Sequence, residues 1–586
     1  RGRGALRAEL DKLDGVVPLV GDGLCPRLGT PKLRAMLVLL LISPSDGLCV
    51  QGRPPTWLGK SRFAGRSSGI VAKPMPKHFP YGSSSFEKIR RSGQYFRDNT
   101  RFITELEKVQ NAGVLLNRPT RWGKTLLQGT LMVYYDEHTT QRKYEELFRG
   151  LHIYNHTTEG CGKYQVLSLN FANAVGRTPD AREKTLWEHI NNRCAFFAKK
   201  YRYEKELVIN EDAMITLERL ASAVKARRDS WGWRQGWRRK RPWRTRPPEL
   251  YIFIDEYDSY IYSLLTRLPA LQEPTDKARE DLDSGVPVVT ALNQLKSLEA
   301  ADLVSRFMII GLARVKWADS SKANNIDLLS AETSFGDACG LGLDDIKGGL
   351  DYLNLTEAQT LEALKLMKHC FNGYRFPGVG IGADDGLYNA QLCNRFLKAL
   401  CVEENLRWLD PSDDEHWAKL TDSALVARMN DDQSDPPWAM LQLLARSGKA
   451  AADLLVLANG GSLEHSEDLL QQRYSIKALL DNSQLLERPD AVAATRNFMY
   501  DMGLATLDAN GTKIKAPNAV VRELLRRKAV PAAKSAQKRR TDEGNQRLKE
   551  DLKDVGSSLG GGPRWWWWIK PEPEADRRDN LRVVYR

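Results

Sequence analysis

Short apolar runs that end in polar residues alternate along this chain with longer segments in which apolar residues recur at helical spacing. The runs that we interpret as buried strands are residues 114–116, 166–171, 251–254 and 307–311. The segments that we interpret as helices are residues 126–134, 180–203 with Asp180 as a cap, 259–268, 287–298, 357–370 and 388–400. This alternation predicts an α/β fold in which helices flank a parallel sheet of five or so strands, with 307–311 as the last strand.

The pattern changes towards the end of the chain. Residues 402–486 are helical with acidic breaks, and two segments, 500–507 and 512–516, then flank an Asn-Gly turn. An Asn-Gly pair in this position is typical of a β-hairpin. Helices followed by a hairpin, with a further helix over 518–527, predict a winged-helix-like module.

Candidate chemistry first appears where the strand at 114–116 leads into the helix at 126–134. Gly123, Lys124 and Thr125 stand at this junction. A helix N-terminus attracts phosphate, a Gly lets the backbone approach it, a Lys supplies charge for the terminal phosphates, and a Thr hydroxyl can bind Mg²⁺. The common phosphate-loop pattern starts with Gly, whereas this chain has Arg118 there. Alone, the tripeptide leaves open an exposed Lys at a helix start.

A second element changes that balance. The apolar run at 251–254 ends in Asp255 and Glu256, as expected of a buried parallel strand that presents acids at the edge where ligands bind. Asp255 is placed to hold Mg²⁺, and Glu256 to orient or deprotonate an attacking water. The alternative is an ordinary strand whose acids cap the next helix. With both elements in this order, the sequence predicts nucleotide binding.

Motifs in a fixed order extend well beyond these two elements. They are residues 86–90, 95–103, 118–125, 148–153, 166–171, 254–258, 307–314, 324–327, 372–376 and 388–389. In this order they resemble the AAA-ATPase-like family over roughly residues 83–400, with a weaker similarity at 490–525. The resemblance implies a P-loop NTPase core followed by a helical lid, with ATP and Mg²⁺ as cofactors. In many members a restriction-endonuclease-like nuclease domain follows.

The resemblance also assigns roles to single residues. The family's loop reads R-P-x-R-x-G-K-[ST], so that Arg118 is expected there. The residues expected to bind the cofactor are Arg118, Pro119, Arg121, Gly123, Lys124, Thr125 and Asp255, of which Thr125 and Asp255 are the expected metal ligands. The expected catalytic residues are Glu256 and Arg314. Arg314 stands where related ATPases keep an Arg that senses the γ-phosphate, and its alternative role is that of a surface Arg. This chain has Ala313 where family members carry Ser.

Charge adds a separate hypothesis. The 586 residues have a net charge of +13, and ten Lys and Arg against one Asp lie between Lys225 and Arg246. From Arg227 to Arg246, Arg and Trp residues are interleaved. Such a segment can follow a phosphate backbone while its indoles stack on bases, or it can be a solvated insertion loop, the interpretation that we favour.

These patterns divide the chain into four parts. We expect residues 1–82 to be disordered or unreliable sequence, 83–400 to form the AAA-ATPase-like domain with an Arg/Trp-rich insertion at 225–248, 401–530 to be helical and winged-helix-like, and 531–586 to be a low-complexity tail. After Val530 no apolar strand is present that could carry nuclease ligands. We therefore expect the nuclease domain to be missing.

The function predicted on these grounds is that of a P-loop protein that binds Mg-ATP, hydrolyses it slowly and acts as a switch or motor. The alternative is a catalytically weak nucleic-acid-binding protein that uses the basic insertion. No apolar run reaches the length of a membrane span, and we expect an intracellular protein. Besides ATP, the partners considered are nucleic acid at the insertion and further copies of the chain in a homo-oligomer.

Overall fold

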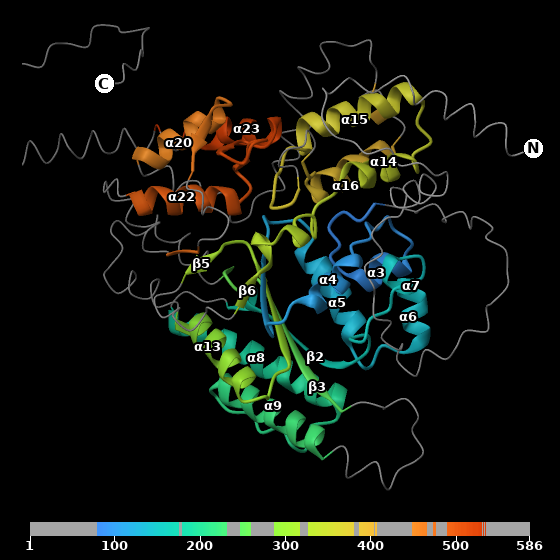
Figure 1. Cartoon of the computed structure of the whole chain (residues 1–586), viewed down its shortest axis with the longest axis vertical. Coiled ribbons are helices and arrows are strands. Elements are labelled where there is room, and N and C mark those ends of the chain that lie inside the picture. Colours follow the sequence, from blue (N-terminus) through green and yellow to red (C-terminus); the bar gives the residue numbers. More distant parts are fainter. Residues whose placement is uncertain are drawn as a thin grey trace, which may run out of the picture. The chain divides into compact units, whose positions relative to one another are not determined.

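A computed structural model gives the fold of this chain (Figure 1). The residues that it describes are 79–174, 179–230, 247–259, 286–316, 326–379, 386–402, 405–406, 409, 448–465, 473–475, 489–529, 531 and 534. The helix expected at 259–268, most of the helical region expected at 402–486, most of 1–82 and nearly all of 531–586 lie outside these residues.

The centre of the fold is a five-stranded sheet whose neighbouring strands are all parallel. Its strands are β1 (Gly113–Asn117), β2 (Tyr164–Asn170), β3 (Glu249–Asp255), β4 (Arg306–Gly311) and β6 (Ile326–Leu328), in the spatial order β2-β3-β4-β1-β6. The α/β fold predicted from the alternating pattern is confirmed. The prediction that 307–311 is the last strand of this sheet was wrong, because β6 lies later in the sequence and pairs with β1 through three residues.

Helices pack on this sheet and on one another. Those before β4 are α3 (Phe86–Arg91), α4 (Arg101–Lys108), α5 (Lys124–Tyr135), α6 (Gln141–Phe148), α7 (His152–Asn155), α8 (Pro179–Tyr201), α9 (Ala213–Asp229) and α13 (Val286–Ala300). Helix α5 contacts β2, β3 and β4, while α9 contacts β3 and α13. Figure 1 shows α8, α9 and α13 on one side of the strands and α4 and α5 on the other. Since α8 begins at Pro179, Asp180 lies in its first turn and is not the cap that we expected.

Helix α8 also covers the outer edge of β2. Residues 166, 168 and 170 point their backbone groups outward from the sheet, and three side chains of α8 bind them. The Tyr201 hydroxyl accepts from Val166 N at 2.9 Å, Arg193 Nε donates to Ser168 O at 2.7 Å, and His189 Nε2 accepts from Asn170 N at 3.1 Å. A strand edge that would otherwise be open is thereby satisfied by side chains.

A helical lid follows the sheet. Its helices are α14 (Leu343–Leu350), α15 (Glu357–Phe371) and α16 (Ala390–Leu400), which share a second hydrophobic cluster. The Thr356 side chain caps α15 in a capping box with Gln359, as the sequence predicts for Thr356. The turn after α15 contains Gly373 with φ +98, where a β-carbon would lie 2.1 Å from the Pro517 carbonyl oxygen.

The last described part combines helices with a small antiparallel sheet. It contains α20 (Gly448–Ala458), α22 (Pro489–Asp501), α23 (Ala519–Leu524) and strands β7 (Ser462–Glu464), β9 (Thr506–Leu507) and β10 (Lys513–Lys515). The predicted hairpin is present as β9 and β10, although α22 extends to Asp501 and β9 is shorter than expected. Strand β7 pairs with β10. Among the described residues, no helix is long and apolar enough to span a bilayer.

Candidate functional site

The candidate site begins in the loop that joins β1 to α5. This loop comprises residues 118–123, and it ends at Gly123, whose φ of 94° is a left-handed conformation that Gly adopts without steric cost. Arg121 is also left-handed, with φ 65°, and is exposed. The prediction of a strand, a loop and a helix is thus borne out in the backbone, although α5 begins at Lys124 rather than at the expected residue 126.

Lys124 is buried rather than exposed, with 9% of its surface accessible. Its ammonium donates to the carbonyl oxygens of Arg118 at 2.8 Å and Pro119 at 3.0 Å, so that the loop closes around the head of its own lysine. Burial lowers the pKa of Lys124, and the negative charges of Asp258 and Asp255 oppose that effect. The alternative of a solvated Lys at a helix start is therefore wrong.

Thr125 and Asp255 meet across the strand ends. The Thr125 hydroxyl donates to Asp255 Oδ2 at 2.9 Å, and Asp255 is 4% exposed. Among the described residues, no donor binds the buried Oδ1 of the same carboxylate. Burial raises the pKa of Asp255, whereas the Thr125 hydrogen bond and the charge of Lys124 lower it. The two predicted metal ligands are thus adjacent, with one carboxylate oxygen lacking a donor.

Glu256 follows directly and differs from Asp255 in side-chain exposure and in backbone conformation. Its side chain is exposed, and its backbone is left-handed with φ 52°. A residue with a β-carbon adopts this conformation at a cost, and such strain is often found at functional sites. Glu256 therefore faces solvent at the strand end, where a water or a ligand can reach its carboxylate.

Arg118 lies in the loop, but its side chain is directed away from it. The guanidinium donates to the carbonyl oxygens of Asn117, Phe335 and Gly336, at 2.8 to 3.1 Å, and lies over the Phe376 ring at 4.3 Å. Arg118 therefore joins the loop to the segments at 335–376. Its expected contact with the cofactor stays a prediction.

Trp122 was not among the predicted site residues, yet it anchors the loop. Its ring is buried and packs edge-on against Tyr374 and Phe376, with ring centroids 4.8 Å and 5.3 Å apart. The Trp122 carbonyl oxygen accepts from Gly340 N at 3.1 Å. The lid turn at 372–376 thus holds one side of the loop through an aromatic contact.

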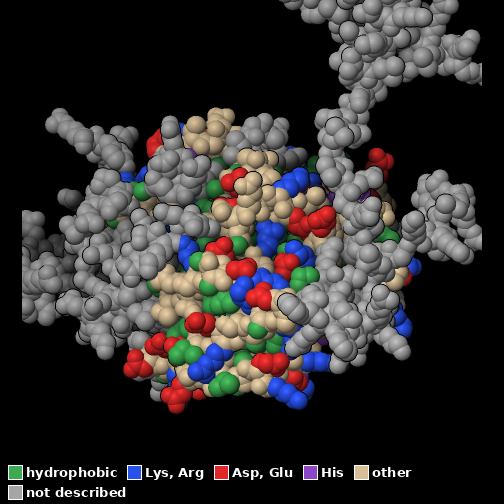
Figure 2. Space-filling view, turned by 60° about the horizontal axis from the view of Figure 1, so that its bottom comes forward, with side chains coloured by type: hydrophobic (Ala, Val, Ile, Leu, Met, Phe, Trp, Pro, Cys, Tyr) green, Lys and Arg blue, Asp and Glu red, His purple; other side chains and the backbone are tan. Residues whose placement is uncertain are grey.

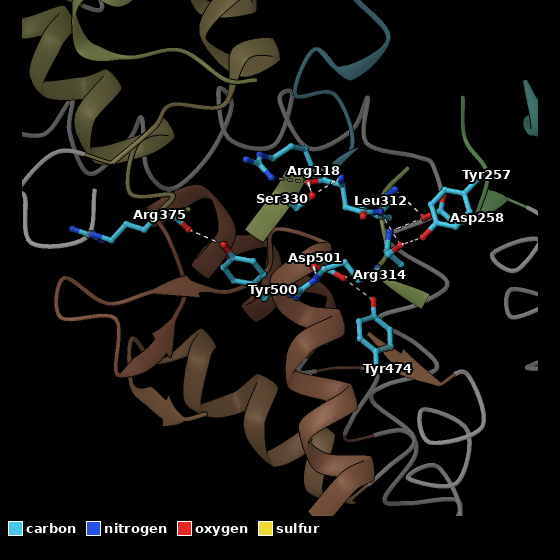
Figure 3. Close-up of polar contacts among 12 residues, drawn as sticks. Arg118, Tyr257, Asp258, Leu312, Arg314, Ser330, Arg375, Tyr474, Tyr500 and Asp501 are labelled. Carbon is cyan, nitrogen blue, oxygen red and sulfur yellow. Dashed lines mark hydrogen bonds and ion pairs between the residues drawn. The ribbon is translucent and has the colours of Figure 1, made fainter. Parts of the chain in front are cut away.

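Arg314 lies three residues beyond the end of β4 and is only 1% exposed. Its Nε donates to Asp501 Oδ1 at 2.8 Å, and its backbone N donates to Asp501 Oδ2 at 3.0 Å (Figure 3). Although burial lowers the pKa of Arg314, the charge of Asp501 raises it, and the net shift is upward. The alternative of a surface Arg is wrong, while the expected role towards the γ-phosphate stays a prediction.

Hydrogen bonds hold the strand ends together around the site. Both Leu312 N and Ala313 N donate to one oxygen of Asp258, at 2.8 Å and 2.6 Å. Asn117 Nδ2 donates to the Ala313 carbonyl at 2.8 Å, and the Ser330 hydroxyl bonds the backbone of Asn117. Figure 3 shows Ser330 beside Arg118, and Asp258 beside Tyr257 near Leu312. The ends of β1, β3 and β4 are therefore linked by side chains as well as by the sheet.

A groove of about 980 Å³ extends from Thr125 and Asp255 between α5, β2 and α8. Gln128 lines it, and the buried Nε2 of this amide has no acceptor among the described residues. Arg193 and Lys200 line the far side, where Arg193 bonds β2 and Lys200 pairs with Asp136. The predicted metal ligands thus open onto a cavity.

The basic segment is only partly described. Its first arginines bind the protein itself: Arg227 donates to two backbone carbonyls and lies 3.5 Å over the Tyr203 ring, and Arg228 pairs with Asp302. Residues 231–246 lie outside the described residues. On the face in Figure 2, Lys and Arg side chains are interspersed with Asp and Glu over the described surface. Two of the arginines expected to contact nucleic acid are therefore engaged at the end of α9.

Sequence reasoning missed two residues that matter here, Asp501 and Trp122. Asp501 stands in the apolar stretch 498–505, in which an acid must find a buried partner. That signal indicates a paired carboxylate, but not that Arg314 is its partner.

Comparisons with known proteins find one family model and one curated relative that are similar to part of this chain. Residues 80–319 match the family described as "Predicted AAA-ATPase". A protein from Azotobacter chroococcum mcd 1, named "Uncharacterized protein in vnfD 5'region", is 25% identical over 310 residues, which are 52% of this chain and 50% of that protein. The match thus spans about half of the relative's length.

Two solved structures align with lower similarity. They are the ORC2 protein of Aeropyrum pernix in ADPNP–ADP complexes, with a TM-score of 0.30 over 80% of this chain and 96% of the other, and Cdc6p of Pyrobaculum aerophilum, with 0.24 over 77% and 96%. Both are 12% identical to this chain. The family match is independent of these alignments, and it coincides with β1, the loop, α5 and β3. The match to the AAA-ATPase-like family model thus covers residues 80–319, which are less than half of this chain.

Proposed function

We propose that this chain binds Mg-ATP at the loop between β1 and α5, hydrolyses it slowly, and changes state with the bound nucleotide. The observation that carries the proposal is the hydrogen bond between Thr125 and Asp255, beside a buried carboxylate oxygen that has no donor among the described residues. The family match supports nucleotide binding. ATP, rather than another nucleotide, is inferred from the family alone.

The residues present fit Mg²⁺. Thr125 offers a hydroxyl oxygen and Asp255 a carboxylate oxygen, and Mg²⁺ in nucleotide sites is held by one or two such protein groups together with phosphates and waters. When bound there, the cation would neutralise charge on the phosphates. Thr125 and Asp255 would hold it.

The chain's own residues have separate tasks in this proposal. Lys124 must exchange the carbonyl oxygens of Arg118 and Pro119 for phosphate oxygens, so the loop has to open when nucleotide binds. Glu256, exposed at the strand end, orients or deprotonates the attacking water. The opening of the loop gives a physical basis for a switch, because the same loop contacts the lid through Trp122.

The test measures Mg-ATP binding by calorimetry and phosphate release by the full chain. We expect Lys124→Ala to bind at least about tenfold more weakly, because the buried charge is lost. We expect Glu256→Gln to retain binding and to release phosphate roughly 100-fold more slowly.

The matched control is Lys108→Ala, which removes an exposed lysine of α4 that pairs only locally with Glu105. It is expected to behave as the wild type. Equal turnover by the wild type and Lys124→Ala would contradict the ATPase. A protease-cleavage pattern that Mg-ATP leaves unchanged would contradict the switch.

A further inference from the structure

Arg314 is held by a carboxylate that comes 187 residues later in the chain. Asp501, the last residue of α22, is buried and binds both the side chain and the backbone N–H of Arg314. The Tyr474 hydroxyl donates to the same Asp501 Oδ2 at 2.9 Å. Figure 3 shows Asp501 next to both Arg314 and Tyr474. One carboxylate thus binds the arginine at its Nε and at its backbone N.

The segment around Asp501 also packs against the loop of residues 118–123. Gly503 has φ +74, and a β-carbon there would lie 3.1 Å from the Pro119 ring. Arg314, Tyr500 and Asp501 line a cavity of about 10 Å³ together with Arg118 and Pro119. This volume is about that of one water-sized probe. The end of α22 therefore lies directly beside the loop that is expected to hold the phosphates.

We propose that Asp501 is a positioning residue for Arg314, and that the segment 489–503 thereby completes the nucleotide site. The proposal rests on the proposed function above, because it requires that Arg314 acts on the phosphates. The carboxylate fixes Nε and the backbone of Arg314 and keeps the guanidinium beside Arg118 and Pro119. Fixing a charged group in place beforehand is what makes such a group effective in a transition state.

A purely structural role explains the pair less well. Buried ion pairs lose much of their attraction to desolvation, and apolar residues of similar volume often replace them without loss of stability. A pair that only held α22 against β4 would therefore be replaceable. A pair that positions a charge for catalysis would not.

The test compares steady-state ATP hydrolysis by the full chain with Asp501→Asn. We expect kcat to fall roughly tenfold, while KM and the calorimetric affinity for Mg-ATP change less than about twofold, because Lys124 and Thr125 are untouched. In an Arg314→Ala background, Asp501→Asn is expected to have no further effect on kcat. Unchanged or faster turnover in Asp501→Asn, or an additive loss in the Arg314→Ala background, would overturn the proposal.

Two further variants separate positioning from folding. Arg314→Met combined with Asp501→Asn removes both charges, while the amide oxygen at position 501 can still accept from the backbone N of residue 314 and from the Tyr474 hydroxyl. We expect this double variant to melt near the wild type with the low kcat of Arg314→Ala. Wild-type turnover in this double variant would overturn the proposal. Asp453→Asn is the matched control, since Asp453 forms a buried pair with Arg496 at 2.8 Å within the same part of the chain. It is expected to lower the melting temperature without changing kcat.

The same measurements separate this inference from the proposed function. If wild-type protein does not bind Mg-ATP, the proposed function fails. If it binds and hydrolyses Mg-ATP through Lys124, but Asp501→Asn hydrolyses as the wild type does, only the positioning role fails.

Discussion

The residues of this site differ from one another in burial and in backbone geometry. Lys124, Asp255 and Arg314 are ionisable groups with less than a tenth of their surface exposed. Ionisable groups are seldom buried to this degree without a paired or functional role. Glu256 is the opposite case, because its side chain is exposed and its backbone carries the strain.

Replacing Glu256 by Gly separates strain from chemistry. Because Gly adopts a φ near 52° without a steric penalty, we expect Glu256→Gly to stabilise the fold by about 0.5–1 kcal/mol. Phosphate release should nevertheless fall to the level of Glu256→Gln. Denaturant unfolding and a phosphate assay would measure the two effects.

The control for this change is Arg202→Gly. Arg202 is also exposed and left-handed, with φ 65°, and it lies after the end of α8. A similar gain in stability with unchanged turnover is expected there. A loss of stability in Glu256→Gly would show that the side chain contributes more to the fold than the strain costs.

At the scale of elements, α8 and β2 show how a helix can cover a strand edge. The hydrogen bonds join side chains of α8 to the backbone of β2, and the strand end at Asn170 lies opposite Asp255 in the register. Sequence periodicity predicted both elements. It did not predict that His189 and Arg193 bind the strand edge, because a helical pattern shows which side is apolar but not which neighbour it meets.

His189 makes this contact sensitive to pH. Its Nε2 accepts from Asn170 N and must be unprotonated to do so. Burial lowers the pKa of His189, and the positive charge of Arg193 lowers it further. The unfolded chain therefore binds more protons below the ordinary His pKa of about 6.5. Stability is expected to be full above that pH and to decrease as the pH falls through it towards the lowered pKa of the folded state.

Melting curves between pH 7.5 and pH 5 test this expectation against a His189→Gln variant, whose amide oxygen can accept the same hydrogen bond without titrating. The wild type should lose more stability over this range than the variant. If the melting temperatures of the two proteins change with pH in parallel, His189 does not contribute to the pH dependence of stability.

At the scale of the whole molecule, the positive charge belongs mainly to one segment. Ten of the Lys and Arg residues lie between Lys225 and Arg246, and the described ones among them, Lys225, Arg227 and Arg228, form ion pairs within the fold. In the sequence the segment follows α9 and precedes β3, the strand that carries Asp255. Helix α9 itself contacts β3. Net charge therefore says little about the site itself.

Neutralising the rest of this segment tests the nucleic-acid alternative. Changing the seven Lys and Arg residues of 231–246 to Gln should leave ATP turnover within about twofold, because no described site residue belongs to the segment. The nucleic-acid alternative requires that binding to single-stranded DNA, measured at several salt concentrations, weakens and loses salt dependence in proportion to the phosphate contacts removed. An unchanged salt slope would remove this segment from the nucleic-acid hypothesis.

The sequence alone determined the alternation of strands and helices, the loop before α5, and the acids at the end of β3. These features are local, since periodicity, glycine and strand-end acids act within a few residues of one another. Only the tertiary structure decided that Lys124 lies inside the loop, that Thr125 meets Asp255, and that Arg314 is paired with Asp501. These contacts join residues up to 187 positions apart. No local pattern contains such partners, because packing brings them together.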